Sequence, residues 1–272
     1  MCRFFGLRAS APTTVACCLV RARNSLMAQS RRDLAGFDNA DGWGIATYEG
    51  QTVRVLRDAA PAHISEDFRA AACALEAPTI LAHVRRATVG AMVPENTHPF
   101  THGPWAFVHN GTVPYIDDVR LRLLEAMTPE HRAAIQGTTD SEHLFHMILS
   151  ARERAPLAPL REVLTACLRE VLTWCHAIGP HPRLGLNVLL TDGRQMVGSR
   201  WQRSLYWVER RRLADCEVCG LPHARCAEPD GYQALAIASE PITGEPWQEV
   251  PERSVYEVTP ELRLRIEPLQ EA

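Results

Sequence analysis

The second residue of the chain is a cysteine, and its place beside Met1 gives it chemistry that an internal cysteine lacks. A small second residue permits removal of the initiator methionine, after which Cys2 would carry both a thiol and a free α-amine. The amine has a reference pKa of about 7.7–8.0, so it is partly neutral at pH 7 and can accept the thiol proton. Taken alone, Cys2 is also explained as a small apolar residue that opens a strand.

Asn110 and Gly111 follow the apolar run 105–108 and His109. An Asn side-chain amide and a Gly backbone N–H at the end of a strand are two donors for the oxyanion of an acyl transfer. One such donor stabilises the transition state by about 2.7–4 kcal/mol. The alternative is a turn, because Asn-Gly is a strong hairpin signal.

Two further positions suit the charged head of an amino acid. The guanidinium fork of Arg85 could bind a carboxylate, unless Arg85 is a solvated rim charge together with Arg86. Thr139 followed three residues later by Glu142 predicts a capping box, which puts Asp140 in the first turn of a helix. An acidic residue needs no function there, but it is also an anion that could receive an ammonium group.

A group of Cys and His residues lies in an irregular insert at about 211–231 and could bind a structural zinc ion: Cys216, Cys219, His223 and Cys226. Thiolate and imidazole ligands suit tetrahedral zinc, and four protein ligands leave no open catalytic position. The spacing between the pairs is tighter than in common fingers, so the alternatives are free thiols in a loop or one disulfide. The other internal cysteines are expected in the core: Cys17, Cys18, Cys73, Cys167 and Cys175.

The composition of the chain excludes several classes of protein. The 272 residues are 46% hydrophobic, which is enough for a sizeable core. Every one of the 29 basic residues is arginine, which excludes a P-loop lysine, a Schiff-base lysine and a Ser-Lys dyad. The net charge of -3 argues against a nucleic-acid partner. We find no membrane span or signal peptide, and therefore expect a cytoplasmic address, no membrane partner and cysteines that are free, catalytic or metal-bound.

The elements that must position these residues fall into two batches of strands around central helices. Short β-type runs bounded by turn formers lie at 3–7, 43–48, 52–56, 79–85 and 105–109, and again at 186–190, 195–199, 205–209, 234–239 and 255–259. Apolar residues at helical spacing predict helices at 14–29, 118–127, 141–150 and 160–176. This order predicts layered sheets covered by helices.

Seven short segments extend these motifs in a fixed order along nearly the whole chain: Met1-Cys2-Arg3, Asn39-Ala40-Asp41-Gly42-Trp43-Gly44, His83-Val84-Arg85-Arg86-Ala87-Thr88-Val89-Gly90, Glu95-Asn96-Thr97-His98-Pro99-Phe100, His109-Asn110-Gly111, Thr139-Asp140-Ser141-Glu142 and Ala238-Ser239-Glu240-Pro241. This ordered set resembles the glutaminase domain of the class II glutamine amidotransferases. Within that family it is most similar to the stand-alone YafJ/EgtC/Dug3-like subgroup.

The resemblance implies an α+β fold, the four-layer αββα sandwich of the N-terminal-nucleophile hydrolases, with two antiparallel sheets between helices. One glutaminase domain would span residues 2–272, and catalysis would need no cofactor. The implied roles are Cys2 as nucleophile and amine base, Asn110 and Gly111 as oxyanion hole, Arg85 and Thr88 as ligands of the glutamyl carboxylate, and Asp140 as ligand of the glutamyl amine.

The implied activity is cleavage of the γ-amide of glutamine or of a γ-glutamyl compound through a thioester on Cys2. The chain has little length left for a synthase domain, so the ammonia or amine is either released or taken up by a separate synthase or peptidase subunit. Sugar-phosphate members of the family carry His where Val89 stands, which removes a polar contact. Two alternatives are a catalytically silent subunit that binds γ-glutamyl ligands or serves as a scaffold, and an acylase for non-glutamyl amides.

Overall fold

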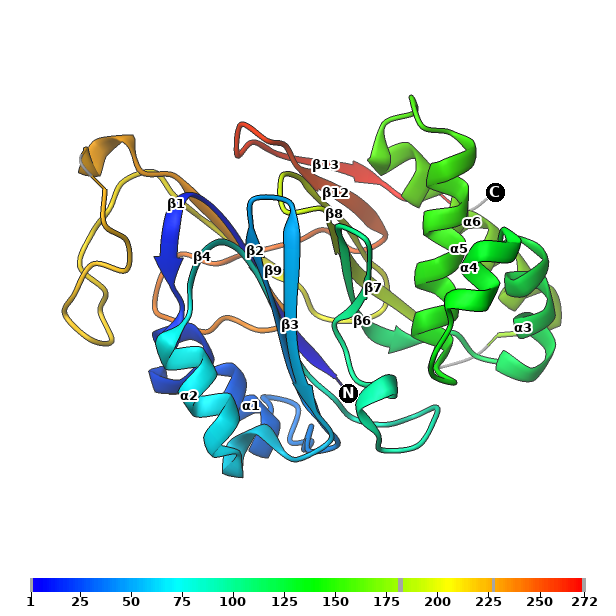
Figure 1. The fold of residues 1–272 in the computed structure, drawn as a ribbon, viewed down its shortest axis with the longest axis horizontal. Helices are drawn as coiled ribbons and strands as arrows, with labels where there is room; N and C mark the ends of the chain where they lie inside the picture. Colours follow the sequence, from blue (N-terminus) through cyan, green and yellow to red (C-terminus); the bar gives the residue numbers. More distant parts are fainter. Residues whose placement is uncertain (1, 181–182, 227, 271–272) are drawn as a thin grey trace.

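Two antiparallel sheets lie face to face in the computed structural model, which describes residues 2–180, 183–226 and 228–270 (Figure 1). The larger sheet has the strand order β11 (Gln248–Glu249), β9 (Tyr206–Arg210), β10 (Ala234–Ala238), β1 (Arg3–Thr14), β4 (Glu76–Val84), β2 (Trp43–Glu49) and β3 (Thr52–Asp58). The smaller sheet has the order β13 (Leu264–Pro268), β12 (Ser254–Val258), β8 (Met196–Arg200), β7 (Gly185–Thr191), β6 (Trp105–Thr112) and β5 (Phe100–His102).

Helices cover the outer face of each sheet (Figure 1). The larger sheet is covered by the short π-helical segment η1 (Cys17–Arg21), α1 (Leu26–Arg31) and α2 (Glu66–Ala74). The smaller sheet is covered by α3 (Ile116–Glu125), α4 (Pro129–Ala134), α5 (Asp140–Arg154) and α6 (Leu160–Ile178). The layers therefore confirm the predicted αββα sandwich. Within the described ranges, no helix has both the length and the apolar character needed to cross a bilayer.

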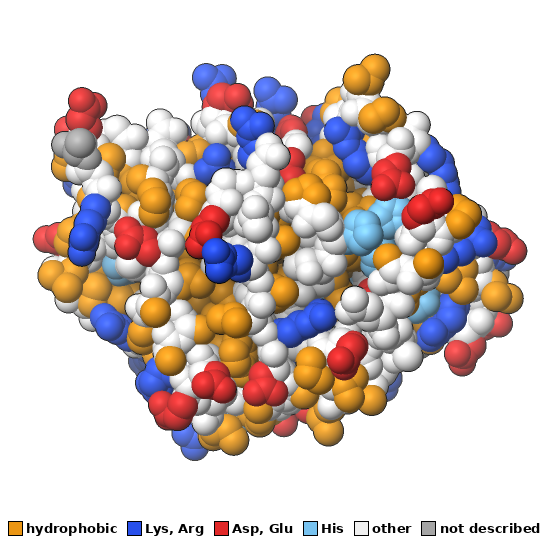
Figure 2. Space-filling model, in the orientation of Figure 1, with side chains coloured by type: hydrophobic (Ala, Val, Ile, Leu, Met, Phe, Trp, Pro, Cys, Tyr) orange, Lys and Arg blue, Asp and Glu red, His pale blue; other side chains and the backbone are white. Residues whose placement is uncertain are grey.

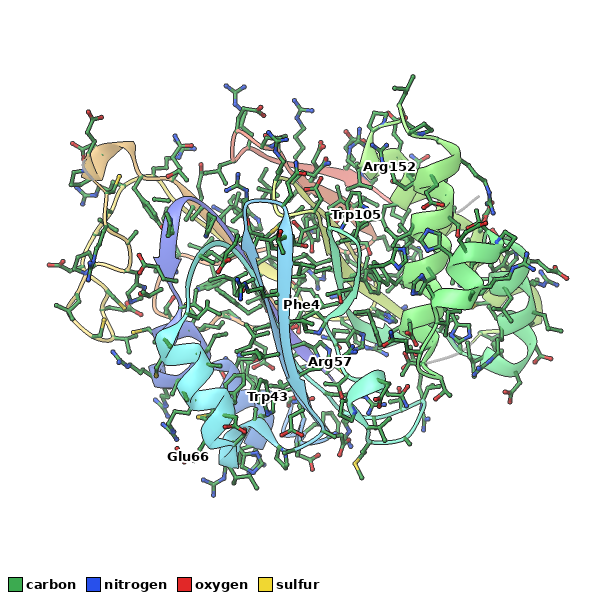
Figure 3. The ribbon with its side chains drawn as sticks, in the orientation of Figure 1. Phe4, Trp43, Arg57, Glu66, Trp105 and Arg152 are labelled. Atoms are coloured by element: carbon green, nitrogen blue, oxygen red, sulfur yellow. The ribbon has the colours of Figure 1, made fainter. Side chains whose placement is uncertain are left out.

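Alternation along the strands assigns each apolar side chain to one of the two faces. In β1, Phe5 and Leu7 pack against the helical layer, whereas Phe4 packs between the sheets, in the middle of the molecule (Figure 3). Gly6 also faces the space between the sheets, where a Cβ would come within 2.6 Å of the Leu189 side chain. Small and large residues of the two sheets therefore interdigitate, as native packing density requires.

Local capping signals account for several helix starts. The hydroxyls of Ser25, Ser65, Thr128 and Thr139 each accept a hydrogen bond from the backbone N–H three residues later, at the first turns of α1, α2, α4 and α5. The predicted helices of the middle segment are confirmed as α3, α5 and α6, with ends that differ by up to four residues. Helices α2 and α4 and strands β5, β11 and β13 were not predicted.

The prediction of one helix over 14–29 is wrong. Strand β1 continues to Thr14, because after a register shift Thr13 and Thr14 still pair with β4. The chain then forms η1, becomes extended at Ala22 and starts α1 only after the Ser25 cap. Strand pairing thus takes only the first residue of the predicted helix, and the extended Ala22 and the Ser25 cap divide the rest into two short helical segments.

Candidate functional site

Cys2 directly precedes β1 and is partly exposed. Its sulphur accepts a hydrogen bond from the Arg86 backbone N–H at 3.2 Å and donates one to the Arg86 carbonyl at 3.3 Å. Burial of the sulphur raises the pKa of the Cys2 thiol, and the Arg86 backbone hydrogen bond and the positive charge of Arg85 oppose this only in part. The sulphur is therefore a protonated thiol at neutral pH, so a reaction at this atom needs a base.

Buried ion pairs fix the start of β1. The Arg3 guanidinium lies 2.7 Å from the Asp33 carboxylate and 3.0 Å from the Glu240 carboxylate, and all three side chains are at most 4% exposed. Because breaking a buried ion pair strands a charge away from water, this network holds the backbone at Cys2 in one position. The sequence predicted no role for Arg3, although its place beside Cys2 was an available signal.

Asn110 and the start of β1 belong to different sheets, and they meet at Ser239. The Ser239 hydroxyl accepts a hydrogen bond from the Phe4 N–H at 3.0 Å and one from the Asn110 side-chain amide at 3.4 Å. Asn110 is buried on the same strand face as Val108, which packs between the sheets. One hydroxyl thus joins Asn110 to the backbone two residues from Cys2. The sequence placed Ser239 in a motif but gave it no role.

Asn110 and Gly111 lie inside β6, so the hairpin alternative is wrong. Strand β6 continues to Thr112, and the ladder with β7 pairs Asn110 with Asn187 and Gly111 with Leu186. The predicted strand ended at His109, because an Asn-Gly pair ordinarily marks a turn. The ladder with β7 holds both residues in extended conformation instead.

The ladder also determines where the Gly111 N–H points. Leu186 donates its own N–H to the Trp201 carbonyl, on the side of β7 away from β6. In an antiparallel ladder this makes Leu186 and Gly111 a non-hydrogen-bonded pair, so the Gly111 N–H points away from β7. Strand β5 pairs with β6 only as far as Phe107, so this N–H lies beyond its end. A Cβ at position 111 would collide with the Gly185 backbone, which explains the glycine.

Arg85 is buried at the end of β4 and binds the loop that follows it. Nη1 donates to the Ala91 carbonyl at 2.9 Å, and Nη2 donates to the Val89 carbonyl at 2.9 Å. Burial lowers the pKa of Arg85, whereas the charges of Cys2 and Asp140 raise it, so both groups lie within electrostatic reach. Arg85 is therefore not a solvated rim charge, and part of its five N–H donors stays available to an anion.

The loop before β2 covers the segment after β4. The Asp41 carboxylate accepts a hydrogen bond from the Ala87 N–H at 2.7 Å. Arg86 is partly exposed, lies over the Phe37 ring at 4.7 Å and lies 3.7 Å from the Asp38 carboxylate. These contacts hold the backbone that touches the Cys2 sulphur, a role that the sequence did not predict for Asp41.

Half of the predicted capping box is present at the start of α5. The Thr139 hydroxyl accepts a hydrogen bond from the Glu142 N–H at 3.2 Å. The Glu142 carboxylate, however, accepts hydrogen bonds from the backbone N–H groups of Gln136 and Gly137 at 2.9 and 2.7 Å. It therefore fixes the preceding loop, and the cap still places Asp140 in the first helical turn as predicted.

Asp140 and Thr88 each join the end of β6 to another segment. The Asp140 carboxylate accepts a hydrogen bond from the Val113 N–H at 2.7 Å, directly after β6. The Thr88 and Thr112 hydroxyls are 3.3 Å apart, and Thr88 is exposed. Six predicted residues thus lie where β1, β4, β6 and α5 begin or end: Cys2, Arg85, Thr88, Asn110, Gly111 and Asp140.

Buried histidines lie next to this group. His83 donates from Nε2 to the His109 carbonyl at 3.3 Å, and its ring lies 4.2 Å from the His98 ring. His109 lies between the Ser141 hydroxyl at 2.9 Å and the Gly185 carbonyl at 2.8 Å. Burial lowers the pKa of all three histidines, that of His83 to about 3. They are therefore neutral at pH 7 and contribute packing and hydrogen bonds rather than charge.

The predicted Cys/His group lies at the other end of β1 and has a different membership. Cys216, Cys219 and His223 gather as predicted, but the fourth side chain near them is Cys17, from η1. The Cys226 sulphur lies 3.2 Å from the Glu228 carbonyl, outside this group. Cys17 is buried as expected, but nothing in the local sequence links it to the insert. The expectation that Cys73 also lies in the core is wrong, because Cys73 is exposed on α2.

The chain is similar to known proteins over almost its whole length. A family model for class-II glutamine amidotransferases matches residues 1–258. The γ-glutamyl-hercynylcysteine sulfoxide hydrolase of Mycobacterium tuberculosis is 30% identical over 264 residues, covering 95% of this chain and 93% of that protein. The probable glutamine amidotransferase DUG3 of Saccharomyces cerevisiae is 27% identical over 297 residues, covering 95% of this chain and 82% of that protein.

A solved structure has the same fold. A glutamine aminotransferase class-II domain protein from Silicibacter pomeroyi superimposes with a TM-score of 0.66, covering 98% of this chain and 99% of that one. Its sequence identity is 20%, so this likeness concerns the fold alone.

Proposed function

The chain belongs to the class-II glutamine amidotransferase family, and on that premise we propose that it hydrolyses the γ-amide of a γ-glutamyl compound with Cys2 as the nucleophile. The observation that carries the proposal is the shared Ser239 hydroxyl. It hydrogen-bonds the Phe4 backbone, two residues from Cys2, and the amide of Asn110, although these belong to different sheets. This shared contact supports the proposal that Cys2 and Asn110 act on one substrate carbonyl.

The first half of the reaction forms a thioester. After removal of Met1, the Cys2 α-amine takes the thiol proton and the sulphur attacks the δ-carbonyl carbon of the substrate. The carbonyl oxygen becomes an oxyanion and accepts hydrogen bonds from the Asn110 amide and the Gly111 N–H. When the C–N bond breaks, the Cys2 ammonium returns its proton to the departing amine. The raised pKa of the thiol makes the amine base necessary.

The second half of the reaction releases glutamate. A water molecule gives one proton to the Cys2 amine and attacks the thioester carbonyl, with the same two oxyanion donors. The C–S bond then breaks, and the sulphur recovers the proton from the ammonium. Sulphur, amine and protein are back in their starting states, so the cycle needs no cofactor.

The charges near Cys2 favour a substrate with an amino-acid head group. Arg85 keeps N–H donors for an α-carboxylate, and the exposed Thr88 hydroxyl lies at the same edge. The Asp140 carboxylate receives backbone and hydroxyl hydrogen bonds from Val113 and Ser141, which leave it part of its capacity for an ammonium group. Arg85 carries a positive charge and Asp140 a negative one. This pair of opposite charges matches a zwitterion better than it matches a simple acyl amide.

The test compares Cys2→Ala with Cys73→Ala, since Cys73 is an exposed cysteine on α2. Both variants are assayed for amine release from glutamine, glutathione, a γ-glutamyl anilide and a simple acyl anilide. We expect the wild type and Cys73→Ala to cleave γ-glutamyl substrates, and Cys2→Ala to lose on the order of 10³-fold or more in kcat. Mass spectrometry should find Met1 absent and a diazo-oxo-norleucine adduct on Cys2.

The other possible outcomes test the alternatives to this proposal and the role of the α-amine. Turnover by Cys2→Ala overturns the proposal, and equal cleavage of the simple acyl anilide identifies an acylase instead. A Cys2 adduct without turnover of any substrate identifies a silent ligand-binding subunit. Turnover by the isolated chain means that a separate synthase or peptidase subunit is not needed for hydrolysis. An uncleaved N-terminal extension should abolish turnover nearly as completely as Cys2→Ala, because it converts the amine base into an amide.

A further inference from the structure

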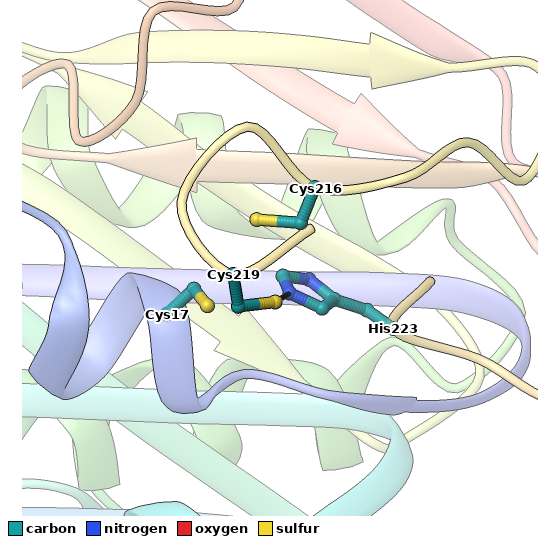
Figure 4. Close-up of side chains that lie close together, drawn as sticks. All are labelled: Cys17, Cys216, Cys219 and His223. Atoms are coloured by element: carbon teal, nitrogen blue, oxygen red, sulfur yellow. Dashed lines mark hydrogen bonds between the residues drawn. The ribbon is translucent and has the colours of Figure 1, made fainter. Parts of the chain in front are cut away.

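Four ligand atoms of the kind that bind zinc converge where the insert meets η1. The sulphurs of Cys17, Cys216 and Cys219 and a ring nitrogen of His223 all lie within 4.8 Å of one another. Figure 4 shows Cys17 reaching this point from the helix and the other three side chains reaching it from the loop. Three cysteines and one histidine are a complete tetrahedral set for structural zinc.

We propose that Cys17, Cys216, Cys219 and His223 bind one structural Zn²⁺ ion, and that this ion joins the insert to the start of η1. The spacing of the ligand atoms fits the ion. Zn–S distances of about 2.3 Å and Zn–N distances of about 2.0–2.1 Å, at a tetrahedral angle, put sulphur and nitrogen about 3.5 Å apart. The Cys219 sulphur and the His223 Nε2 atom are 3.5 Å apart.

The turn between Cys216 and Cys219 brings the two sulphurs of these residues together. The Cys216 sulphur accepts a hydrogen bond from the Val218 N–H at 3.3 Å, and such a contact fixes the orientation of a ligand. The Cys216 carbonyl accepts a hydrogen bond from the Gly220 N–H at 2.8 Å, closing the turn. Gly220 has a φ of +69°, which a residue with a side chain rarely adopts. The turn therefore brings Cys219 back beside Cys216.

Backbone contacts bring His223 beside the element that carries Cys17. The His223 carbonyl accepts a hydrogen bond from the Thr14 N–H at 2.7 Å and another from the Thr14 hydroxyl at 3.1 Å. The next residue, Ala224, forms a β-bridge with Thr13. Cys17 follows three residues after Thr14 and is 1% exposed. These contacts fix the histidine and the buried cysteine at one junction.

The ion would hold a segment that has little regular structure of its own. Across 211–231 the described residues contain one short 3-10 turn and one isolated bridge. Metal binding supplies folding free energy to such segments. Cys2 and Cys17 lie at opposite ends of the 12-residue β1, so the ion has no part in the chemistry at Cys2.

The first test uses the unmodified chain. Zinc analysis of protein purified without added metal should give one equivalent per chain. Cobalt substitution should give thiolate-to-cobalt charge-transfer absorption and the ligand-field bands of a tetrahedral site. Alkylation followed by peptide mass spectrometry should find Cys17, Cys216 and Cys219 protected until a chelator is added, with Cys226 reactive throughout. Chain without zinc that also fails to bind cobalt, or a protected Cys226 beside a reactive Cys17, overturns the proposal.

The second test uses a matched pair of variants. Cys17→Ser should lose the bound zinc and the thiolate-to-cobalt absorption, whereas Cys226→Ser in the same insert should keep both. Retention of zinc by Cys17→Ser, or its loss from Cys226→Ser, contradicts the proposed ligand set. If Cys17→Ser does not fold, the alkylation pattern of the unmodified chain decides the question.

A second candidate metal-binding group consists of three histidines and serves as a control for the ligand assignment. Histidine side chains gather at the surface near α5 (Figure 2), and the ring nitrogens of His102, His131 and His146 lie within 4.8 Å of one another. The Nδ1 atoms of His131 and His146 face each other at 3.0 Å, and His131 Nε2 lies 3.1 Å from Glu153. Two of the three rings are thus already engaged. Loss of the zinc on His102→Ala with retention on Cys17→Ser would assign the metal to this group and overturn the proposal.

Discussion

Asn110→Ala separates the proposed oxyanion role of Asn110 from a purely structural one, and Asn187→Ala is its matched control. The two asparagines are directly paired across β6 and β7, and both side chains are fully buried. The Asn187 amide donates to the carbonyls of Arg203 and Ser204 at 3.0 and 3.2 Å and accepts from the Trp201 N–H at 2.8 Å. Its side chain therefore has a complete structural role.

Asn110 is bound much more weakly in the folded chain. Its amide makes one long hydrogen bond of 3.4 Å to Ser239, and among the described residues its Oδ1 atom has no donor. The Ser239 hydroxyl keeps its hydrogen bond from the Phe4 N–H when Asn110 is truncated. A buried asparagine with this few contacts is expected where the side chain serves a ligand rather than the fold.

These contacts set the expected magnitudes. Asn187→Ala leaves the buried Trp201 N–H without a partner, which costs about 1–3 kcal/mol, and removes two part-buried hydrogen bonds of about 0.5–1.5 kcal/mol each, so the free energy of unfolding should fall by roughly 3 kcal/mol. Asn110→Ala loses one weak hydrogen bond, about 0.5–1.5 kcal/mol. Its kcat should nevertheless fall on the order of 10²- to 10³-fold, because one oxyanion donor is lost.

The assay measures urea unfolding and turnover of a γ-glutamyl anilide on the same preparations, with kcat expressed per folded molecule. We expect opposite patterns: a stable Asn110→Ala enzyme with low kcat, and an unstable Asn187→Ala enzyme with near-normal kcat below its unfolding range. An Asn110→Ala variant that keeps wild-type kcat would refute the oxyanion assignment. A loss of stability as large as that of Asn187→Ala would refute the structural reasoning.

Three further predictions concern the surroundings of the site. Arg3→Met should lower the free energy of unfolding by about 3–5 kcal/mol in urea titrations, because Asp33 and Glu240 stay buried without their cation; a loss below about 1 kcal/mol would contradict this. The folded-state pKa of His83 is about 3, so below about pH 6.5 the unfolded chain binds this proton and the folded chain does not. The free energy of unfolding should therefore fall as the pH falls, by roughly 1.6 kcal/mol from pH 6.5 to 5 for this residue. His83→Asn should flatten the slope, and an unchanged slope would argue against this assignment. Gly111→Ala should cost about 1–3 kcal/mol by overpacking against β7 and also lower kcat, and wild-type values for both would disprove the close approach.

The sequence by itself determined the family, the fold and much of the local structure. The order of Cys2, Arg85, Asn110 and Asp140 predicted the family and the fold, and the Thr139 cap placed Asp140 correctly at the start of α5. These signals are local, because caps, strand alternation and motif spacing depend on residues within a few positions of one another.

Tertiary structure alone decided how distant segments meet. It buried Arg85 against its own loop, extended β6 through Asn110 and Gly111, and put Cys17 in the place expected for Cys226. Ser239 gained its position between the two sheets in the same way. Contacts of this kind depend on the packing of whole sheets and helices, whose free energy is spread over many residues and leaves little trace in any short stretch of sequence.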